Sequence, residues 1–143
     1  MVWILALGVL AMLLVPTVAY GFINGKAVEL ELASIGDGYR LRSDAARAFL
    51  AMRAEAARDG IALRVNSAFR TMAEQQALFA KWQTNTGSLA ARPGYSNHQS
   101  GIAVDIDTDG TATNIYLWLA ANASRWSFKR TVPSEPWHWE FRP

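Results

Sequence analysis

The sequence of 143 residues contains no cysteine and only two histidines, His98 and His138. The absence of cysteine excludes disulfide bonds and thiolate metal sites. A transition metal in this chain must therefore be bound by His, Asp or Glu side chains. With two histidines available, a site built on imidazole groups needs both of them and at least one carboxylate.

Charge is also sparse, since Asp, Glu, Lys and Arg make up 18% of the residues and the formal net charge is +2. The fourteen basic residues are scattered, and Lys129 and Arg130 are their only adjacent pair. Proteins that bind nucleic acid concentrate basic residues on one face, so we expect no nucleic-acid partner. The length and the hydrophobic fraction of 51% predict one globular domain, and we expect a monomer.

No charged side chain precedes Lys26, and residues 3–15 form an unbroken run of apolar residues and glycine. Small residues around Ala19 are typical of a cleaved signal peptide. The run can also be extended to Ile23, which is long enough for an uncleaved membrane anchor, and a buried core helix is the third interpretation. We expect residues 1–20 to be a signal peptide or anchor and residues 21–143 to be the functional domain. The domain would then be periplasmic, extracellular or anchored to the outer face of the cytoplasmic membrane.

Periodicity in the remaining sequence mixes helices and strands without regular alternation, and a turn signal stands at Asn24-Gly25. The predicted class is α+β, with a small antiparallel sheet flanked by helices. Thr71 to Glu74 has the pattern of a capping box, and Ser43 is a candidate N-cap. The predicted helices cover Asp44–Asp59, a segment beginning at Thr71, and Asn114–Ala123. The predicted strands cover 61–65, 102–106 and 137–141.

Alternation along two of these strands places polar side chains opposite apolar ones. Asp105 faces away from Ile102, Val104 and Ile106, and His138 faces away from its aromatic neighbours. If the two strands are adjacent, Asp105, His138 and the preceding His98 can converge. Two imidazoles and one carboxylate are the ligand set of a catalytic zinc site with a position left for water. The alternative is that each residue is an ordinary structural polar group.

Glu135 and Glu140 flank His138, and either could be a catalytic base. Simple alternation places Glu140 beside His138. Pro136 interrupts the pattern, however, so a bend could turn Glu135 toward the site. The residues alone leave both glutamates open.

Three segments carry a family resemblance. Ser96 to Asp105 reads SNHQSGIAVD and matches S-x-H-x-x-G-x-A-x-D, and Glu135 to Trp139 reads EPWHW. Ser67 to Thr71, with Gln75 following, is similar to S-x-Y-R-S…Q. Together these segments, over about Gly21 to Phe141, resemble the VanY-type D-alanyl-D-alanine carboxypeptidases. That family is part of the zinc peptidases that include lysostaphin-like enzymes and the hedgehog zinc domain.

The resemblance implies one zinc ion bound by His98, Asp105 and His138. It also implies that Glu135, not Glu140, is the general base. Arg70 matches the arginine that binds the scissile carbonyl oxygen and the developing oxyanion. The positions implied to contact substrate or form the pocket are Ser96, Ser67 and Gln75.

By this resemblance, the expected function is zinc-dependent hydrolysis of the terminal D-Ala-D-Ala bond of peptidoglycan stem peptides. The alternatives are an L,D-carboxypeptidase, a phage-type endolysin endopeptidase, or a zinc-stabilised cell-wall-binding module without turnover. The presence of Glu135 and Arg70 favours catalysis over the binding module. Phe69 stands where tyrosine is common and Ala68 where glycine is frequent, which affects the expected pocket specificity.

Overall fold

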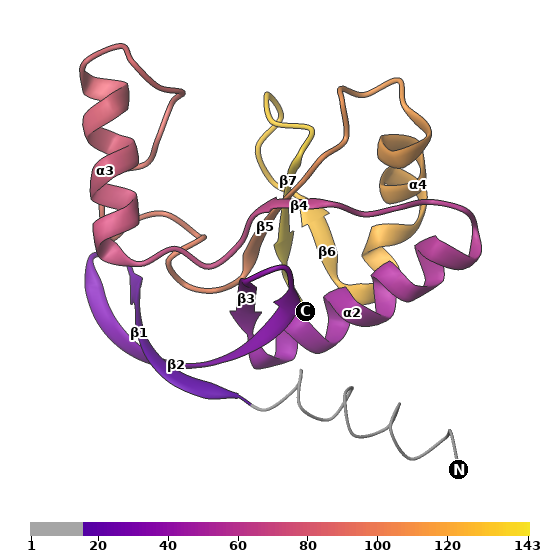
Figure 1. The fold of residues 1–143 in the computed structure, drawn as a ribbon, viewed down its shortest axis with the longest axis horizontal. Helices are drawn as coiled ribbons and strands as arrows, with labels where there is room; N and C mark the ends of the chain where they lie inside the picture. The colour runs from indigo at the N-terminus through magenta and orange to yellow at the C-terminus, as the bar shows by residue number, and fades with distance from the viewer. Residues whose placement is uncertain (1–15) are drawn as a thin grey trace.

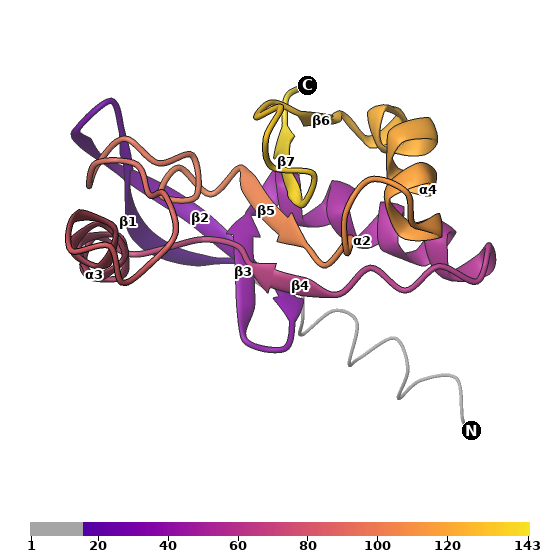
Figure 2. The same ribbon diagram turned by 90° about the horizontal axis from the view of Figure 1, so that it is seen from above.

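A computed structural model describes residues 16–143, which form two antiparallel sheets with helices around them (Figures 1 and 2). The α+β class predicted from periodicity is confirmed. In chain order the elements are β1 (Thr17–Ile23), β2 (Lys26–Gly36), β3 (Tyr39–Arg42), α2 (Ser43–Arg58), β4 (Val65–Ser67), α3 (Met72–Gln83), β5 (Ala103–Ile106), α4 (Asn114–Asn122), the 3₁₀ turn η1 (Ala123–Trp126), β6 (Phe128–Arg130) and β7 (His138–Phe141).

The first sheet has the strand order β1-β2-β3. Asn24 and Gly25, with φ of 50° and 79°, form the tight turn between β1 and β2, as the Asn-Gly pair predicts. The domain boundary expected at residue 20 falls inside β1, since Thr17 to Ala19 pair with Leu32 to Leu30. Alternation in this segment was missed because its apolar residues continue the N-terminal run.

The predicted signal peptide or anchor lies mostly in residues 1–15, which are outside the described residues, so it stays a prediction. Within residues 16–143, no helix has both the length and the apolar character needed to cross a membrane.

The second sheet has the order β4-β5-β7-β6 and places the predicted strands around 102–106 and 137–141 side by side. Val104 pairs with Trp139, and Asp105 pairs with His138. The first pair is buried in the core, which also holds Ile106 and Phe141. The strand predicted at 61–65 is displaced, because the ladder begins only at Val65.

Helix α2 supplies one wall of the core and packs on β2, β3 and η1. Its buried face includes Ala45, Phe49, Met52 and Ala56, which recur at helical spacing. The predicted N-cap, Ser43, is instead the first helical residue, and its hydroxyl donates to the Glu31 carbonyl at 3.0 Å.

Helix α3 is different, because it lies at one end of the molecule, away from α2 and α4 (Figures 1 and 2). Its capping box is present as predicted: the Thr71 hydroxyl accepts from the Glu74 amide, and Glu74 accepts from the Thr71 amide. The only buried side chain of the helix is the polar Gln75. Its apolar residues Leu78 and Trp82 are 36% and 39% exposed, so this helix contributes little to the core.

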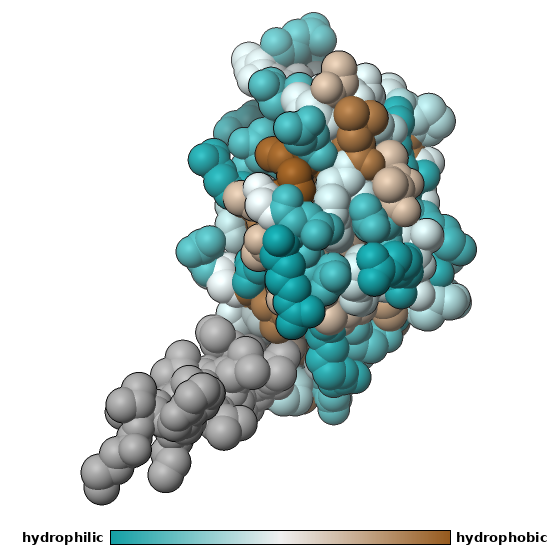
Figure 3. Space-filling view, turned by 90° about the vertical axis from the view of Figure 1, so that its right-hand side faces the viewer, coloured by the Kyte–Doolittle hydropathy of each residue, from teal (hydrophilic) through white to brown (hydrophobic). Residues whose placement is uncertain are grey.

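The opposite end of the molecule, which carries α4, presents a mainly hydrophilic face in which brown patches are small and separate (Figure 3). Leu117, on α4, is 54% exposed. Isolated exposed apolar side chains are normal on a protein surface, so this face gives no indication of a docking site.

Candidate metal centre

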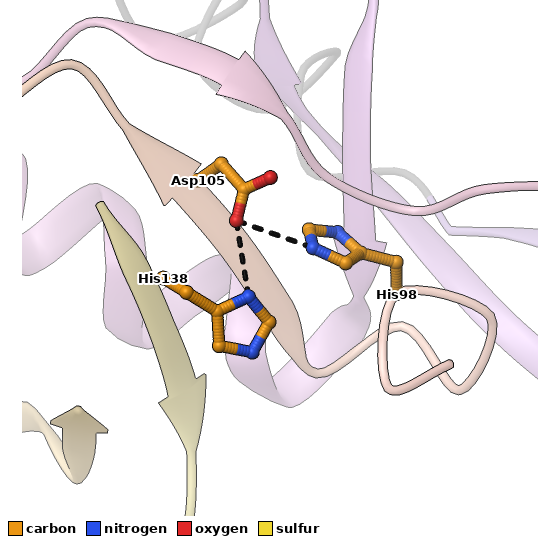
Figure 4. Close-up of side chains that lie close together, drawn as sticks. All are labelled: His98, Asp105 and His138. Atoms are coloured by element: carbon orange, nitrogen blue, oxygen red, sulfur yellow. Dashed lines mark hydrogen bonds and ion pairs between the residues drawn. The ribbon is translucent and has the colours of Figure 1, made fainter. Parts of the chain in front are cut away.

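His98, Asp105 and His138 converge at one point, and their nearest ligand atoms all lie within 4.8 Å of one another. Asp105 Oδ1 is 3.2 Å from His98 Nε2 and 3.1 Å from His138 Nδ1 (Figure 4). The three side chains come from the turn before β5, from β5 and from β7. Among the described residues, no other group of His, Asp or Glu side chains has this spacing.

Sheet register explains the placement of two of these residues. Asp105 and His138 are direct cross-strand partners, so their side chains project from the same face of the sheet. Their neighbours Val104 and Trp139 project into the core from the other face and fix the two strands. His98 is held by its turn, where its carbonyl accepts from the amides of Arg70 and Gly101, each at 3.2 Å.

In each histidine, the ring nitrogen that points away from Asp105 has a hydrogen-bond partner. These partners determine which nitrogen carries the proton. His98 Nδ1 lies 2.8 Å from the Ala68 carbonyl, which can only accept, so this nitrogen carries a proton. His138 Nε2 lies 2.9 Å from Glu140 Oε1. In neutral imidazoles this leaves a lone pair on His98 Nε2 and on His138 Nδ1, the two nitrogens beside Asp105. The donor set therefore fits a transition metal such as zinc.

Asp105 and His138 shift each other's pKa in opposite directions. Burial raises the pKa of Asp105, but hydrogen bonds from His138 and His98 outweigh burial and hold the pKa well below its usual range. Burial lowers the pKa of His138, yet hydrogen bonds to Asp105 and Glu140 raise it to about 9. In the metal-free protein at neutral pH, a proton on His138 thus neutralises part of the carboxylate charge.

Glu135 and Glu140 both approach His138, but from different sides. Glu135 Oε2 is 3.7 Å from Nδ1, the nitrogen that faces the centre, and the Glu135 side chain is 25% exposed. Glu140 is next to Nε2, and its side chain is 3% exposed. The bend anticipated at Pro136 is present, since the His138 amide donates to the Glu135 carbonyl at 3.1 Å. Both glutamates line the cleft, but Glu135 is the more exposed and lies beside the nitrogen that faces the centre, so it is the better placed to reach water and substrate.

Arg70 is fixed beside the centre by three hydrogen bonds. Its Nη2 donates to Asp105 Oδ2 at 3.2 Å, Nε to Ser67 Oγ at 2.9 Å and Nη1 to Gln75 Oε1 at 3.3 Å. Gln75 Nε2 in turn donates to the Ala91 carbonyl at 2.8 Å. Burial lowers the pKa of Arg70 from a very high ordinary value, and the guanidinium remains charged at neutral pH.

The centre opens into a cleft of about 620 Å³. Its wall includes Arg70, Ser96 and Glu135, as the sequence predicts for substrate-facing residues. Ser67 and Gln75 do not line the cleft, contrary to their expected place in the pocket. Their polar atoms are instead turned to the Arg70 guanidinium, which lies between them and Asp105.

Apart from His98, Asp105, His138 and Glu140, the rest of the cleft wall was not predicted as functional from the sequence. Tyr95 and Asn97 flank Ser96, and their position next to the histidine motif is the one signal that could have identified them. The remaining wall comes from α3 and the loop after it and from the turn before β7, for which the sequence has no comparable signal. Phe69 is absent from this wall and lies in a separate hollow with Arg40 over its ring, so the missing phenolic hydroxyl does not belong to the cleft.

An α+β domain with two imidazole nitrogens and a carboxylate facing one point, beside a partly exposed glutamate and a fixed arginine, has the fold and the site of a metallopeptidase. Comparison with known families agrees with this class. The chain belongs to the VanY family of D-alanyl-D-alanine carboxypeptidases, whose family model matches residues 38–143. The resemblance inferred from the three motifs is confirmed.

A curated relative, the D-alanyl-D-alanine carboxypeptidase of Enterococcus faecalis (strain ATCC 700802 / V583), is 34% identical over 80% of this chain. The chain spans about half of that relative, 52% of its length.

Solved structures also match most of this chain. The vancomycin-resistance D,D-pentapeptidase VanY from a VanB-type cassette, a mutant in complex with Zn(II), is 28% identical with a TM-score of 0.67, over 84% of this chain and 82% of that one. VanYB in complex with D-alanine-D-alanine is 28% identical with a TM-score of 0.66, over 80% and 78%. The LdcB LD-carboxypeptidase is 25% identical with a TM-score of 0.62, over 71% and 59%.

Proposed function

We propose that the chain is a zinc-dependent carboxypeptidase that removes the terminal D-alanine from D-Ala-D-Ala stem peptides of peptidoglycan. The observation that carries this proposal is the convergence of His98, Asp105 and His138 on one point of a cleft that also holds Glu135 and Arg70. The complexes of the VanY relatives with Zn(II) and with D-alanine-D-alanine support the choice of metal and of substrate.

The metal site has the composition of a catalytic zinc centre. Three protein ligands, His98 Nε2, Asp105 Oδ1 and His138 Nδ1, would hold one ion and leave a position for water. When bound, zinc lowers the pKa of a coordinated water to about 7 and polarises the scissile carbonyl. A structural zinc would take four protein ligands.

The side chains around the centre supply the remaining chemistry. Glu135 accepts a proton from the attacking water and delivers it to the leaving amine. Arg70, held by Ser67 and Gln75, donates hydrogen bonds to the carbonyl oxygen as negative charge develops there. Ser96 lies in the cleft wall and binds the substrate beside the scissile bond.

The deciding experiment uses purified protein with defined stem pentapeptide, tetrapeptide and cross-linked dimer, with products identified by mass. We expect loss of one D-alanine from the pentapeptide. Release from the tetrapeptide alone would make the protein an L,D-carboxypeptidase, and cleavage of the dimer alone would make it an endopeptidase. No product from any of the three, with zinc bound, would support the non-catalytic binding module.

Metal dependence is tested in the same assay. Chelation should abolish activity and zinc should restore it, and His98→Ala should lose zinc affinity together with some stability, because metal binding is linked to folding. Full activity in protein shown to be metal-free by elemental analysis would contradict the proposal.

We also propose that the chain acts outside the cytoplasm, as a monomer. The apolar run of residues 3–15 and the location of peptidoglycan support export. The proposed ligands, Glu135 and Arg70 already lie together around one cleft of a single domain, so the proposed reaction requires no residue from a second copy. Cell fractionation with and without residues 1–15 tests the first point, and light scattering during gel filtration tests the second.

A further inference from the structure

Glu140 is a buried carboxylate that the proposed reaction does not use. The residue is 2% exposed, although it lies next to the C-terminal end of β7. Its hydrogen-bond partners are His138, Asn97 and Arg142, with a further side-chain hydrogen bond from Thr131. Burying a carboxylate is costly unless its oxygens are paired, so the donors around Glu140 are what keep it in this position.

The two oxygens of Glu140 have separate sets of donors. Oε1 lies 2.9 Å from His138 Nε2 and accepts from Asn97 Nδ2 at 2.8 Å. Oε2 accepts from Arg142, from Nε at 2.9 Å and also from Nη2. The carboxylate is therefore clamped between the arginine on one side and the histidine and asparagine on the other.

We propose that Glu140 is a positioning residue that keeps the proton of His138 on Nε2, so that Nδ1 is free to bind the metal. A neutral imidazole has one protonated nitrogen, and a carboxylate can only accept a hydrogen bond. Glu140 therefore favours the tautomer with Nε2–H and disfavours the one with Nδ1–H, which could not act as a ligand. Arg142 and Asn97 hold Glu140 in the orientation required.

The substitution Glu140→Gln distinguishes this function from simple packing. It replaces one of the two accepting oxygens by an NH₂ group, which can only donate. If the amide nitrogen of the glutamine faced Arg142, its NH₂ group would lie against the guanidinium, and both groups can only donate hydrogen bonds. With the amide oxygen toward Arg142, the NH₂ group would face His138 and require Nε2 to accept. That arrangement puts the proton on Nδ1 and competes with the metal.

The experiment measures the zinc dissociation constant by competition with a chromophoric chelator in four proteins: wild type, Glu140→Gln, Arg142→Ala and the double variant. We expect Glu140→Gln to weaken zinc binding about 10- to 100-fold, the usual cost of losing an outer-shell partner. We expect Arg142→Ala alone to have a smaller effect. The double variant should bind zinc more tightly than Glu140→Gln, because the amide oxygen can then turn to His138 and Asn97.

This rescue separates positioning from packing, since two structural losses would add and make the double variant the weakest binder. Equal zinc affinity of wild type and Glu140→Gln, or a double variant weaker than Glu140→Gln, would overturn the proposal. If Glu140→Gln does not fold, ¹⁵N NMR of zinc-loaded wild type still decides, because it should show a proton on His138 Nε2 and none on Nδ1. A proton on Nδ1 would refute the proposal.

The inference rests on the metal site of the proposed function, but the two can fail separately. Wild-type protein that binds no zinc would refute the proposed function. Wild-type protein that binds zinc without any dependence on residue 140 would refute only the positioning function.

Discussion

The two sides of the cleft are built in different ways. Asp105, His138 and Glu140 project from paired central strands whose opposite faces are buried in the core. Arg70 and Gln75 belong to a loop and a helix, and α3 buries no apolar side chain of its own. The metal side is therefore fixed by the backbone ladder and the core, whereas the substrate side is fixed by hydrogen bonds between side chains. Substitutions on the metal side should change mainly the metal affinity. Substitutions on the substrate side should change mainly the turnover.

The largest effect on turnover without loss of metal is expected for Glu135→Ala. Glu135 is not one of the proposed ligands, so zinc should stay bound while the rate falls about 10²–10⁴-fold, the usual size of a general acid–base contribution. Glu140→Ala is the comparison, and at saturating zinc it should lose much less. Steady-state kinetics with measured zinc content checks both. The reverse result would assign the base to Glu140 and show that strand alternation was the better guide.

The next largest effect is expected for Arg70→Ala, which removes the cation from the substrate side. Turnover should fall about 10²–10³-fold, as for the loss of one oxyanion donor, with zinc retained. Arg64→Ala is a matched control, because Arg64 is exposed and pairs only with Asp107, at 3.4 Å. A loss of zinc in Arg70→Ala would mean that its contact with Asp105 Oδ2 matters more than its contact with substrate.

An intermediate effect is expected in the pH dependence of the stability of the metal-free protein. It arises from His138, on the metal side of the cleft. The pKa of His138 is raised to about 9, so its proton stabilises the fold below the ordinary pKa near 6.5 and this contribution is lost as pH rises through 9. Urea unfolding should show a loss of about 3 kcal/mol from pH 6.5 to 9.5. His138→Gln should flatten this profile. With zinc bound, stability should not fall in this range, because the metal requires an unprotonated Nδ1.

The smallest effect is expected at Gln75, the only buried side chain of α3. Gln75→Ala removes the contacts with Arg70 and with the Ala91 carbonyl, and we expect up to about tenfold lower kcat/KM with unchanged zinc affinity. The adjacent Gln76 is exposed, so Gln76→Ala is a closely matched control. Weaker zinc binding in Gln75→Ala would show that the two sides of the cleft are not independent.

The difference between side chains on paired strands and side chains on loops also explains what could be predicted from the sequence. Alternation in 102–106 and 137–141 was sufficient to place Asp105 and His138 on one face, because the core determines strand orientation. Alternation could not choose between Glu135 and Glu140, since the choice depends on the turn at Pro136. The contacts of Ser67 and Gln75 with Arg70 were not predictable either, because they join side chains from the end of a strand, a loop and a helix. The strand β1 was missed because its residues extend an apolar run.

The first sheet contacts the loop that carries His98, one of the proposed metal ligands. A Cβ on Gly21 would lie 2.4 Å from the Gln99 carbonyl oxygen, so only glycine allows β1 to lie against the residue after His98. The amides of Phe22 and Gly25 donate to the carbonyls of Gln99 and Gly94, at 3.0 and 2.9 Å. The hairpin and the loop should therefore open as one cooperative unit. Amide hydrogen exchange at Phe22 and Gly25 would then slow when zinc binds His98, making these two distant amides reporters of metal occupancy.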